Sequence, residues 1–373
     1  MNLARPFRSR SALLLAGAAA LPACSSGPAA APDPRPSASA TSPAPRPVAA
    51  VTRDSHARPA PGELKTFADW TVGCDNAGRC AMASLGPDGG DFPPVTVEIA
   101  RDAGPAGAVT LRVLPGRTET AARAIEVDGR RFALDGDVLS DGEAMAAATT
   151  MAGGRSLAIV AGSERHAVSL AGASASLRYV DARQGRAGTV TALVARGAAP
   201  AQTVPAASPM PDVVAVRAAT AAAATDAQWR EMRRIGRCED RMADGDIWTP
   251  RAQGYADGTT LVLLPCSAGA YNEIDALFTI RDGRVAAADV DAASGFEATG
   301  ADPQTPVRSV INGAFDKGML TSFAKGRGLG DCGSAQRFAW DGRRLRLIEQ
   351  TAMGECRGNP NYLTVWRARA VLP

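Results

Sequence analysis

The sequence predicts two mainly β domains, sandwich- or barrel-like and antiparallel with a few short helices, behind a disordered N-terminal tether. Three observations lead to this prediction. Apolar and polar residues alternate with period two, Asp-Gly pairs recur between the alternating runs, and two low-complexity stretches divide the chain. The expected order is a signal peptide at 1–23, a tether at 24–62, a first domain at 63–200, a linker at 201–224 and a second domain at 225–373.

The first 23 residues have the features of an export signal. Three arginines and no acid precede an apolar run at 12–21, which is too short to span a bilayer as a stable helix. The run ends in Leu21-Pro22-Ala23-Cys24, which resembles a bacterial lipobox and implies cleavage before Cys24 and lipidation of its thiol. Because Pro22 is unusual in a lipobox, ordinary secretion is the alternative. We expect a periplasmic protein, anchored by its lipid to the outer membrane of a Gram-negative bacterium.

Charge and composition describe the mature chain. The sequence has 41 basic and 38 acidic residues, and removal of the three arginines of the signal leaves 38 of each. A neutral chain gives no general reason to bind nucleic acid, so we expect no such partner. Residues 24–62 are rich in Pro, Ala and Ser and almost free of large apolar residues, so they cannot bury a core and are predicted to be a disordered tether.

The cysteines agree with export. Apart from Cys24 there are six, an even number suited to an oxidising compartment, and six cysteines allow 15 pairings. Proximity along the chain favours Cys74–Cys80, Cys238–Cys266 and Cys332–Cys356. Zinc is the rival interpretation, but the spacings are wide and the chain has only two histidines, so we expect structural disulfides and no metal.

Strands and tight turns dominate the pattern between the low-complexity stretches. Residues 95–99 and 109–114 alternate as half-buried strands do, and 278–280 and 345–348 flank turns. The pair Asp-Gly is the strongest short-range hairpin signal. It occurs at Asp128-Gly129, Asp135-Gly136, Asp257-Gly258, Asp282-Gly283 and Asp341-Gly342. Helices are predicted at 142–151 and at 226–234, the second with Asp226 as its N-cap.

A glycine-rich stretch, Gly328-Leu329-Gly330-Asp331-Cys332-Gly333, matches the G-x-G-x-x-G fingerprint of dinucleotide sites. That fingerprint works only between a buried strand and the N-terminus of a helix, where backbone N–H groups hold the pyrophosphate. Here residues 336–342 read as a strand that enters a hairpin. We therefore expect no nucleotide and no cofactor, and interpret the glycines as a tight loop beside a disulfide.

No convincing catalytic set emerges from the motifs. Ser322-x-x-Lys325 matches the S-x-x-K nucleophile motif of penicillin-binding proteins, but the companion K-T-G strand is missing. A Ser–His–Asp triad would depend on His166, whose surroundings predict an exposed position on a strand. No catalytic residue is assigned from the sequence.

Several stretches together resemble a proteobacterial envelope family known as a domain of unknown function (number eleven seventy-six). They include Gly236-Arg237-Cys238-Glu239-Asp240, the loop from Lys325 to Gly333, and Gly354-Glu355-Cys356-Arg357-Gly358. The opening segment Phe67-Ala68-Asp69-Trp70-Thr71-Val72-Gly73-Cys74 is also similar to invasion-associated locus B proteins. The first resemblance covers nearly the whole mature chain. It implies an exported β-rich protein, and because the family carries no established activity, no catalytic residue can be carried over from it.

The functional expectation is a non-catalytic binding or assembly module of the periplasm, with an envelope protein or glycan as its partner. The disulfides would gather polar residues of several loops into a binding loop or, equally, into a structural knot. These residues are Tyr271, Asn272, Arg327, Asp331, Glu355 and Arg357. The alternative is a periplasmic hydrolase of cell-wall or lipid substrates that uses Ser322 or an acid pair such as Asp331 and Glu355.

Overall fold

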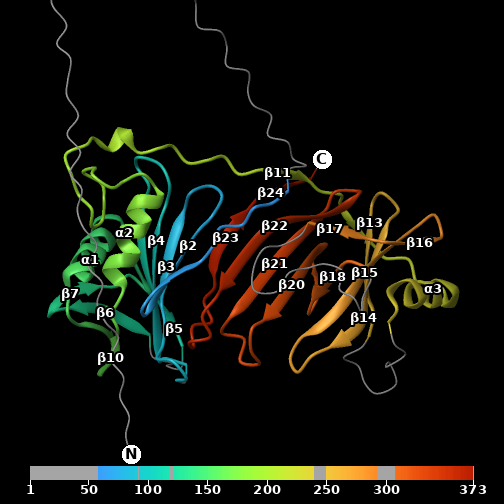
Figure 1. Ribbon diagram of the computed structural model, residues 1–373, viewed down its shortest axis with the longest axis horizontal. Coiled ribbons are helices and arrows are strands. Elements are labelled where there is room, and N and C mark those ends of the chain that lie inside the picture. The colour runs from blue at the N-terminus through green and yellow to red at the C-terminus, as the bar shows by residue number, and fades with distance from the viewer. Residues whose placement is uncertain (1–57, 91, 117–120, 239–248, 292–306, 373) are drawn as a thin grey trace, which may run out of the picture. The chain divides into compact units, whose positions relative to one another are not determined.

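The computed structural model describes residues 58–90, 92–116, 121–238, 249–291 and 307–372. Residues Thr52–Pro373 form one compact unit, shown in Figure 1. The predicted signal peptide and Cys24 lie outside the described residues. The chain is mainly β with three α-helices among the described residues, so the predicted fold class is confirmed. None of the described helices is long and apolar enough to cross a membrane.

The first region contains two antiparallel sheets and two helices. One sheet has six strands in the order β1-β2-β3-β4-β5-β8, and the other has four in the order β10-β9-β6-β7. The strands are β1 (Lys65–Phe67), β2 (Trp70–Cys74), β3 (Cys80–Ser84), β4 (Val95–Arg101), β5 (Val109–Pro115), β6 (Ala122–Val127), β7 (Arg130–Ala133), β8 (Val138–Ser140), β9 (Leu157–Ala161) and β10 (Glu164–Val168).

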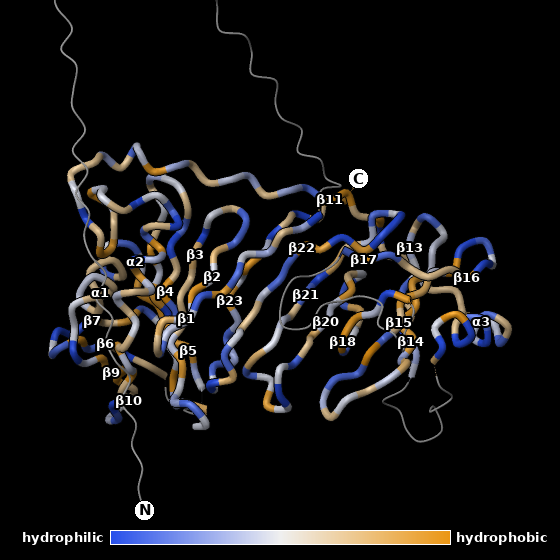
Figure 2. Tube along the Cα trace, in the orientation of Figure 1, coloured by the Kyte–Doolittle hydropathy of each residue, from blue (hydrophilic) through white to orange (hydrophobic). Residues whose placement is uncertain are grey.

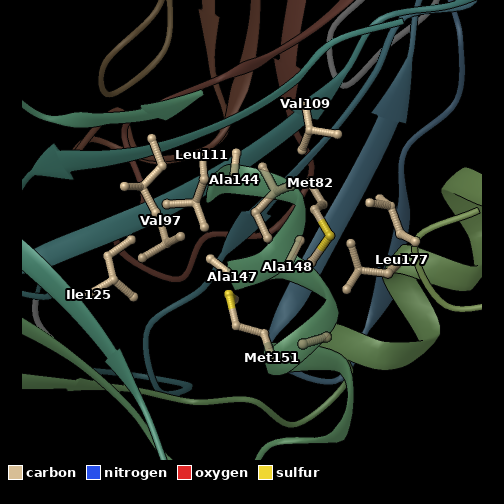
Figure 3. Close-up of a cluster of buried hydrophobic side chains, with 14 of the residues drawn as sticks. Met82, Val97, Val109, Leu111, Ile125, Ala144, Ala147, Ala148, Met151 and Leu177 are labelled. Carbon is tan, nitrogen blue, oxygen red and sulfur yellow. The ribbon is translucent and has the colours of Figure 1, made fainter. Parts of the chain in front are cut away.

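Both sheets and both helices share one core, part of which Figure 3 shows. The six-stranded sheet contributes Met82, Val97 and Leu111, and the four-stranded sheet contributes Ile125. Burial of one large apolar side chain stabilises the fold by roughly 1.5–3 kcal/mol. A core to which both sheets and both helices contribute therefore holds the first region together.

Helix α1 (Asp141–Gly153) confirms the helix predicted at 142–151. Its buried residues Ala144, Ala147, Ala148 and Met151 are spaced for one helical face, and the small alanines let it pack closely on the sheet. Helix α2 (Ala173–Arg183) was not predicted. Its buried residues follow the same spacing, but polar residues dilute the apolar signal so much that sequence reasoning missed it.

The second region is a pair of six-stranded sheets. One has the order β12-β13-β14-β15-β16 with β18 added on β15, and the other has the order β17-β22-β21-β20-β19 with β23 added on β22. The strands are β12 (Ala218–Ala219), β13 (Arg251–Tyr255), β14 (Thr260–Ala268), β15 (Glu273–Arg281), β16 (Arg284–Ala287), β17 (Asp289–Val290), β18 (Ser309–Ile311), β19 (Ala314–Asp316), β20 (Met319–Lys325), β21 (Gly333–Trp340), β22 (Arg344–Met353) and β23 (Leu363–Arg367).

A second core lies between these sheets, with Leu263 and Leu277 from one and Phe338 and Leu347 from the other. Helix α3 (Asp226–Gly236) packs on the opposite face of the first sheet, where Met232 meets Phe278. Its N-cap is Thr225, whose hydroxyl accepts a hydrogen bond from the Gln228 backbone N–H, and not Asp226 as predicted. The capping box with Gln228 explains the difference, since it satisfies two backbone donors reciprocally.

The Asp-Gly pairs form hairpin connections at four of the five predicted places. In the β6–β7 and β15–β16 turns both residues have positive φ, as a two-residue hairpin requires, and Figure 2 shows the β15–β16 turn as hydrophilic. Asp257-Gly258 and Asp341-Gly342 connect β13 to β14 and β21 to β22. Asp135-Gly136 differs, because it joins β7 to β8, which belong to different sheets.

Residues 201–224, the predicted linker, carry short elements of their own. They are a 3-10 turn (Ala201–Thr203), β12, and β11 (Asp212–Val214), which pairs in parallel with β24 (Arg369–Val371). The division of the mature chain into two domains stays a prediction.

Strand β23 of the second region lies beside β2 and β3 of the first. All residues of β2 and β3 are buried, because large side chains face the first core while small ones, such as Gly73 and Ala81, face β23. A Cβ at Gly73 would lie 2.8 Å from Cδ2 of Leu64 and 3.2 Å from Cγ1 of Val365. The small residues therefore permit the close approach of β23.

Candidate functional site

Three disulfides join the cysteines in the predicted pairs, Cys74–Cys80, Cys238–Cys266 and Cys332–Cys356. Local topology explains two of them. Cys74 and Cys80 are register partners on the β2–β3 hairpin, and Cys332 and Cys356 flank the open end of the β21–β22 hairpin. Closing loops of 24 to 28 residues stabilises a fold by roughly 3 kcal/mol each on a chain-entropy account.

The glycine-rich stretch forms the connection between β20 and β21, with no helix after it. Its ends are joined by a 2.7 Å hydrogen bond from the Gly326 N–H to the Cys332 carbonyl. Gly333 has φ of 134°, and a Cβ there would lie 1.9 Å from the Ala324 carbonyl oxygen. The glycines therefore serve a tight hairpin loop, as the sequence predicted.

Within this loop Arg327 and Asp331 form a bidentate ion pair. The Arg327 Nε and Nη2 atoms donate hydrogen bonds of 2.7 and 2.5 Å to the Asp331 carboxylate, which also accepts one from the Gly358 N–H. Burial alone would raise the pKa of the fully buried Asp331 carboxyl, but these hydrogen bonds outweigh burial and hold the pKa below 3.8. Asp331 is thus an ionised structural anchor and not a proton donor at neutral pH.

Tyr271 and Asn272 tie the loop to the neighbouring sheet. The Tyr271 hydroxyl donates to the Gly326 carbonyl, and the Asn272 amide exchanges hydrogen bonds with the backbone of Lys325. Glu355 is half-buried beside Cys356. The structure thus gathers most of the predicted binding-loop residues around the disulfide and satisfies their polar groups internally.

Arg357 turns away from this loop and reaches the first region. It donates to the carbonyl oxygens of Gly86 and Ala68 and to the Asp69 carboxylate at 2.6–2.8 Å. Its side chain is only 13% exposed. Sequence reasoning placed Arg357 with the loop but could not find these partners, because they lie nearly 300 residues away along the chain.

A cavity of about 420 Å³ opens beside Arg357. Its walls combine apolar side chains, among them Leu85, Pro93, Val95 and Val168, with the carboxylates of Asp69 and Asp88. A second hollow of about 520 Å³ shares residues 167–169 with it, so both lie beside the end of β10. Strand β10 is the edge of its sheet (Figure 1), which leaves this flank uncovered by a further strand.

The electrostatics of the cavity are set by three charged groups. A hydrogen bond from Ser169 and the adjoining Arg357 lower the pKa of Asp69, so its carboxylate is ionised. Asp88 is 92% exposed and lies 3.3 Å from Arg357 Nε. Two carboxylates against one guanidinium leave a net negative charge, and the guanidinium is already engaged with carbonyl and carboxylate oxygens.

A second polar cluster lies at the start of β15. The Arg251 guanidinium donates hydrogen bonds to both Glu273 and Asp275, and the Gly313 N–H donates to Asp275 at 2.8 Å. Burial, reinforced by the neighbouring Glu273, raises the pKa of Asp275 to about 7 against the attraction of Arg251. This close acid pair was not found from the sequence, although Glu273-x-Asp275 places both residues on one face of a strand.

The other catalytic candidates do not form a site. Ser322 lies buried on strand β20, and its hydroxyl donates to the Ile311 carbonyl and accepts from the Ile311 N–H. His166 lies on a strand as predicted, but it is half-buried and not exposed, because its register partner Ile159 lies on a buried face. The described residues contain no group of three or more His, Cys, Asp or Glu placed to hold a metal.

The fold defines a disulfide-stabilised, mainly β protein in which the loop around Cys332–Cys356 is a structural hub, held by Arg327, Asp331 and Tyr271. The chain belongs to the family described as "Protein of unknown function (DUF1176)", which matches residues 64–369. It is similar to the Uncharacterized protein YpfG of Escherichia coli (strain K12), with 28% identity over 340 residues that cover 83% of this chain and 94% of that protein. No solved structure matches it. The similarity of the opening segment to invasion-associated locus B proteins stays a prediction.

Proposed function

We propose that this chain is an exported envelope protein that binds a partner protein through the cavity beside β10. Cys24 would carry the lipid, and residues 24–57 would tether the folded part to the outer membrane on its periplasmic side; Gly62, in the predicted tether, is already bonded to Val365 of β23. The three disulfides support an exported location, since disulfides persist mainly in oxidising compartments.

The cavity is the observation that carries the binding role. It combines an apolar wall with ionised carboxylates, and pockets of a few hundred Å³ with this mixture suit a specific ligand group. Three of the Arg357 N–H groups already bind Gly86, Ala68 and Asp69, and the carboxylates of Asp69 and Asp88 outnumber the one guanidinium, so the charge of the cavity disfavours an anion. The complementary group is a cation on an apolar stem, which in a protein partner is a Lys or Arg side chain.

Site-specific photocrosslinking in cells tests this role. A photoreactive amino acid at Ala167, which lines the cavity, is compared with the same residue at Ala182, an exposed position on α2. We expect one envelope protein to crosslink from position 167 alone, at a segment that contains Lys or Arg. The Asp88→Asn substitution should reduce that product several-fold, since it removes one of the carboxylates.

Equal products from both positions, or a product that is unaffected by Asp88→Asn and by removal of the partner's basic residue, would contradict the proposal. A recurring glycan in place of a protein would contradict the choice of partner. A Cys24→Ala variant tests membrane attachment separately from partner binding. The variant should leave the membrane fraction and still crosslink in a periplasmic extract.

One observation favours the rival function, a periplasmic hydrolase of cell-wall or lipid substrates. The acid pair of Glu273 and Asp275 holds one carboxyl with a raised pKa, as general acids do. The buried, engaged hydroxyl of Ser322 disfavours the serine version of that function. Digestion of purified cell-wall fragments that is lost in Glu273→Gln, with the melting temperature unchanged, would establish the hydrolase.

A further inference from the structure

Arg101, at the end of β4, is a buried cation with two side-chain nitrogens that lack a hydrogen-bond partner among the described residues. Its residue is 2% exposed, and strand alternation places it on the core face with Val97 and Ile99. Neither its Nε nor its Nη1 atom has a hydrogen-bond partner among the described residues. Buried polar groups are nearly always hydrogen-bonded, so a guanidinium with two unpartnered nitrogens calls for a bound water or ion.

A second buried arginine lies beside it. Arg186, in the loop after α2, is fully buried and donates to the Gln184 side chain, the Thr191 hydroxyl and the carbonyl oxygens of Asp102 and Gly104. Gln184 in turn donates to the backbone carbonyl of Arg101, which brings the Arg186 side chain close to the end of β4. Burial, followed by repulsion from Arg186, lowers the pKa of Arg101 to about 10.

The nearby acids do not complete the set. Asp181 is fully buried, but its carboxylate accepts three hydrogen bonds from the backbone N–H groups of Leu193, Val194 and Ala195. The Asp102 carboxylate is 58% exposed and lies 3.3 Å from Arg79. Arg101, Arg186 and Arg79 are thus accompanied by two carboxylates, one with its lone pairs largely occupied and one exposed, so this group of residues lacks one negative charge.

We propose that a small monovalent anion such as chloride binds at the unpartnered Nε and Nη1 atoms of Arg101, near the charge of Arg186. It would accept hydrogen bonds from the unpartnered Nε and Nη1 atoms of Arg101 and balance the charge, which a water molecule cannot do. The near-complete burial of both arginines favours a monatomic anion over phosphate or sulfate. The site would lie where the end of β4 meets the loop after α2.

The test compares chloride with gluconate, an anion too large to enter, at constant ionic strength on the intact mature protein. A ligand that binds only the folded state raises the melting temperature, and we expect a shift of roughly 2–4 °C in chloride. Arg101→Met should abolish the shift, whereas Arg112→Met, an exposed arginine on the neighbouring strand β5, should retain it.

Bromide provides a second readout that does not depend on whether Arg101→Met folds. Crystals grown in bromide should show an anomalous peak beside Nε and Nη1 of Arg101. A melting temperature that is the same in chloride and gluconate, a water at that position, or a bromide peak without any shift in solution would each overturn the proposal.

Discussion

The loop around the Cys332–Cys356 disulfide and the cavity beside β10 both contact the segment after Cys356: Gly358 binds the loop and Arg357 lines the cavity. Their carboxylates differ in environment. In the loop, Asp331 is fully buried and bonded to Arg327 and Gly358. At the cavity, Asp88 is 92% exposed and only approaches Arg357. The comparison teaches that a cluster of polar residues can be a structural hub when its groups satisfy one another, whereas a binding site keeps groups open to a ligand.

The largest expected effect on stability follows from removing the Asp331 carboxylate from the loop around Cys332–Cys356. Asp331→Asn removes the charge that holds Arg327 and weakens the acceptor for the Gly358 N–H. We expect the free energy of unfolding to fall by roughly 1–3 kcal/mol, moderated because Arg327 is 32% exposed and can regain water. Urea denaturation measures the change.

Glu355→Gln is the matched control, because Glu355 is half-buried beside the same disulfide. It should change the free energy of unfolding by less than about 0.5 kcal/mol. Equal effects of the two substitutions would contradict the distinction between the hub and its surroundings.

The next effect is a dependence on pH. The pKa of Asp331 is lower in the folded chain than in the unfolded chain, so its contribution is complete above about pH 4 and is lost as the pH falls through the folded-state pKa. We therefore expect the stability difference between the native protein and Asp331→Asn to shrink below pH 4. Urea midpoints measured between pH 2 and 7 test this, and a constant difference across that range would show that the charge is not responsible.

The smallest effect is expected at the cavity. Asp88→Asn should leave the free energy of unfolding within about 0.5 kcal/mol, because an exposed ion pair contributes little. The same substitution should still lower partner crosslinking from position 167. A loss of stability as large as that of Asp331→Asn would mean that the cavity rim is a second hub and not a binding surface.

Prediction from the sequence succeeded where structure is local. The disulfides, the Asp-Gly hairpins and α1 all depend on residues within about 30 positions of each other. Helix α2 was missed because its apolar spacing, Ala173, Leu177 and Val180, is diluted by polar residues that only the surrounding core makes compatible with burial. The N-cap of α3 was misplaced by one residue, since Thr225 and Asp226 are both good caps and the capping box decides between them.

The functional clusters were predicted less completely, for a physical reason. Tyr271, Arg327 and Asp331 were identified because they flank a disulfide. The partners of Arg357, the acid pair on Arg251 and the neighbourhood of Arg101 and Arg186 all depend on contacts between strands and loops distant in the chain.

By itself the sequence determined the mainly β class, the positions of the tight turns and the pairing of nearby cysteines. Alternation and positive-φ turn residues act over a few residues, and a hairpin then brings its own ends together. Only the tertiary structure decided that Arg357 joins the two regions, that an open cavity lies beside β10, and that Arg101 is buried next to another arginine. Those outcomes depend on which surfaces pack against each other. Packing decides the burial and the charge balance of each group, and no short stretch of sequence specifies either.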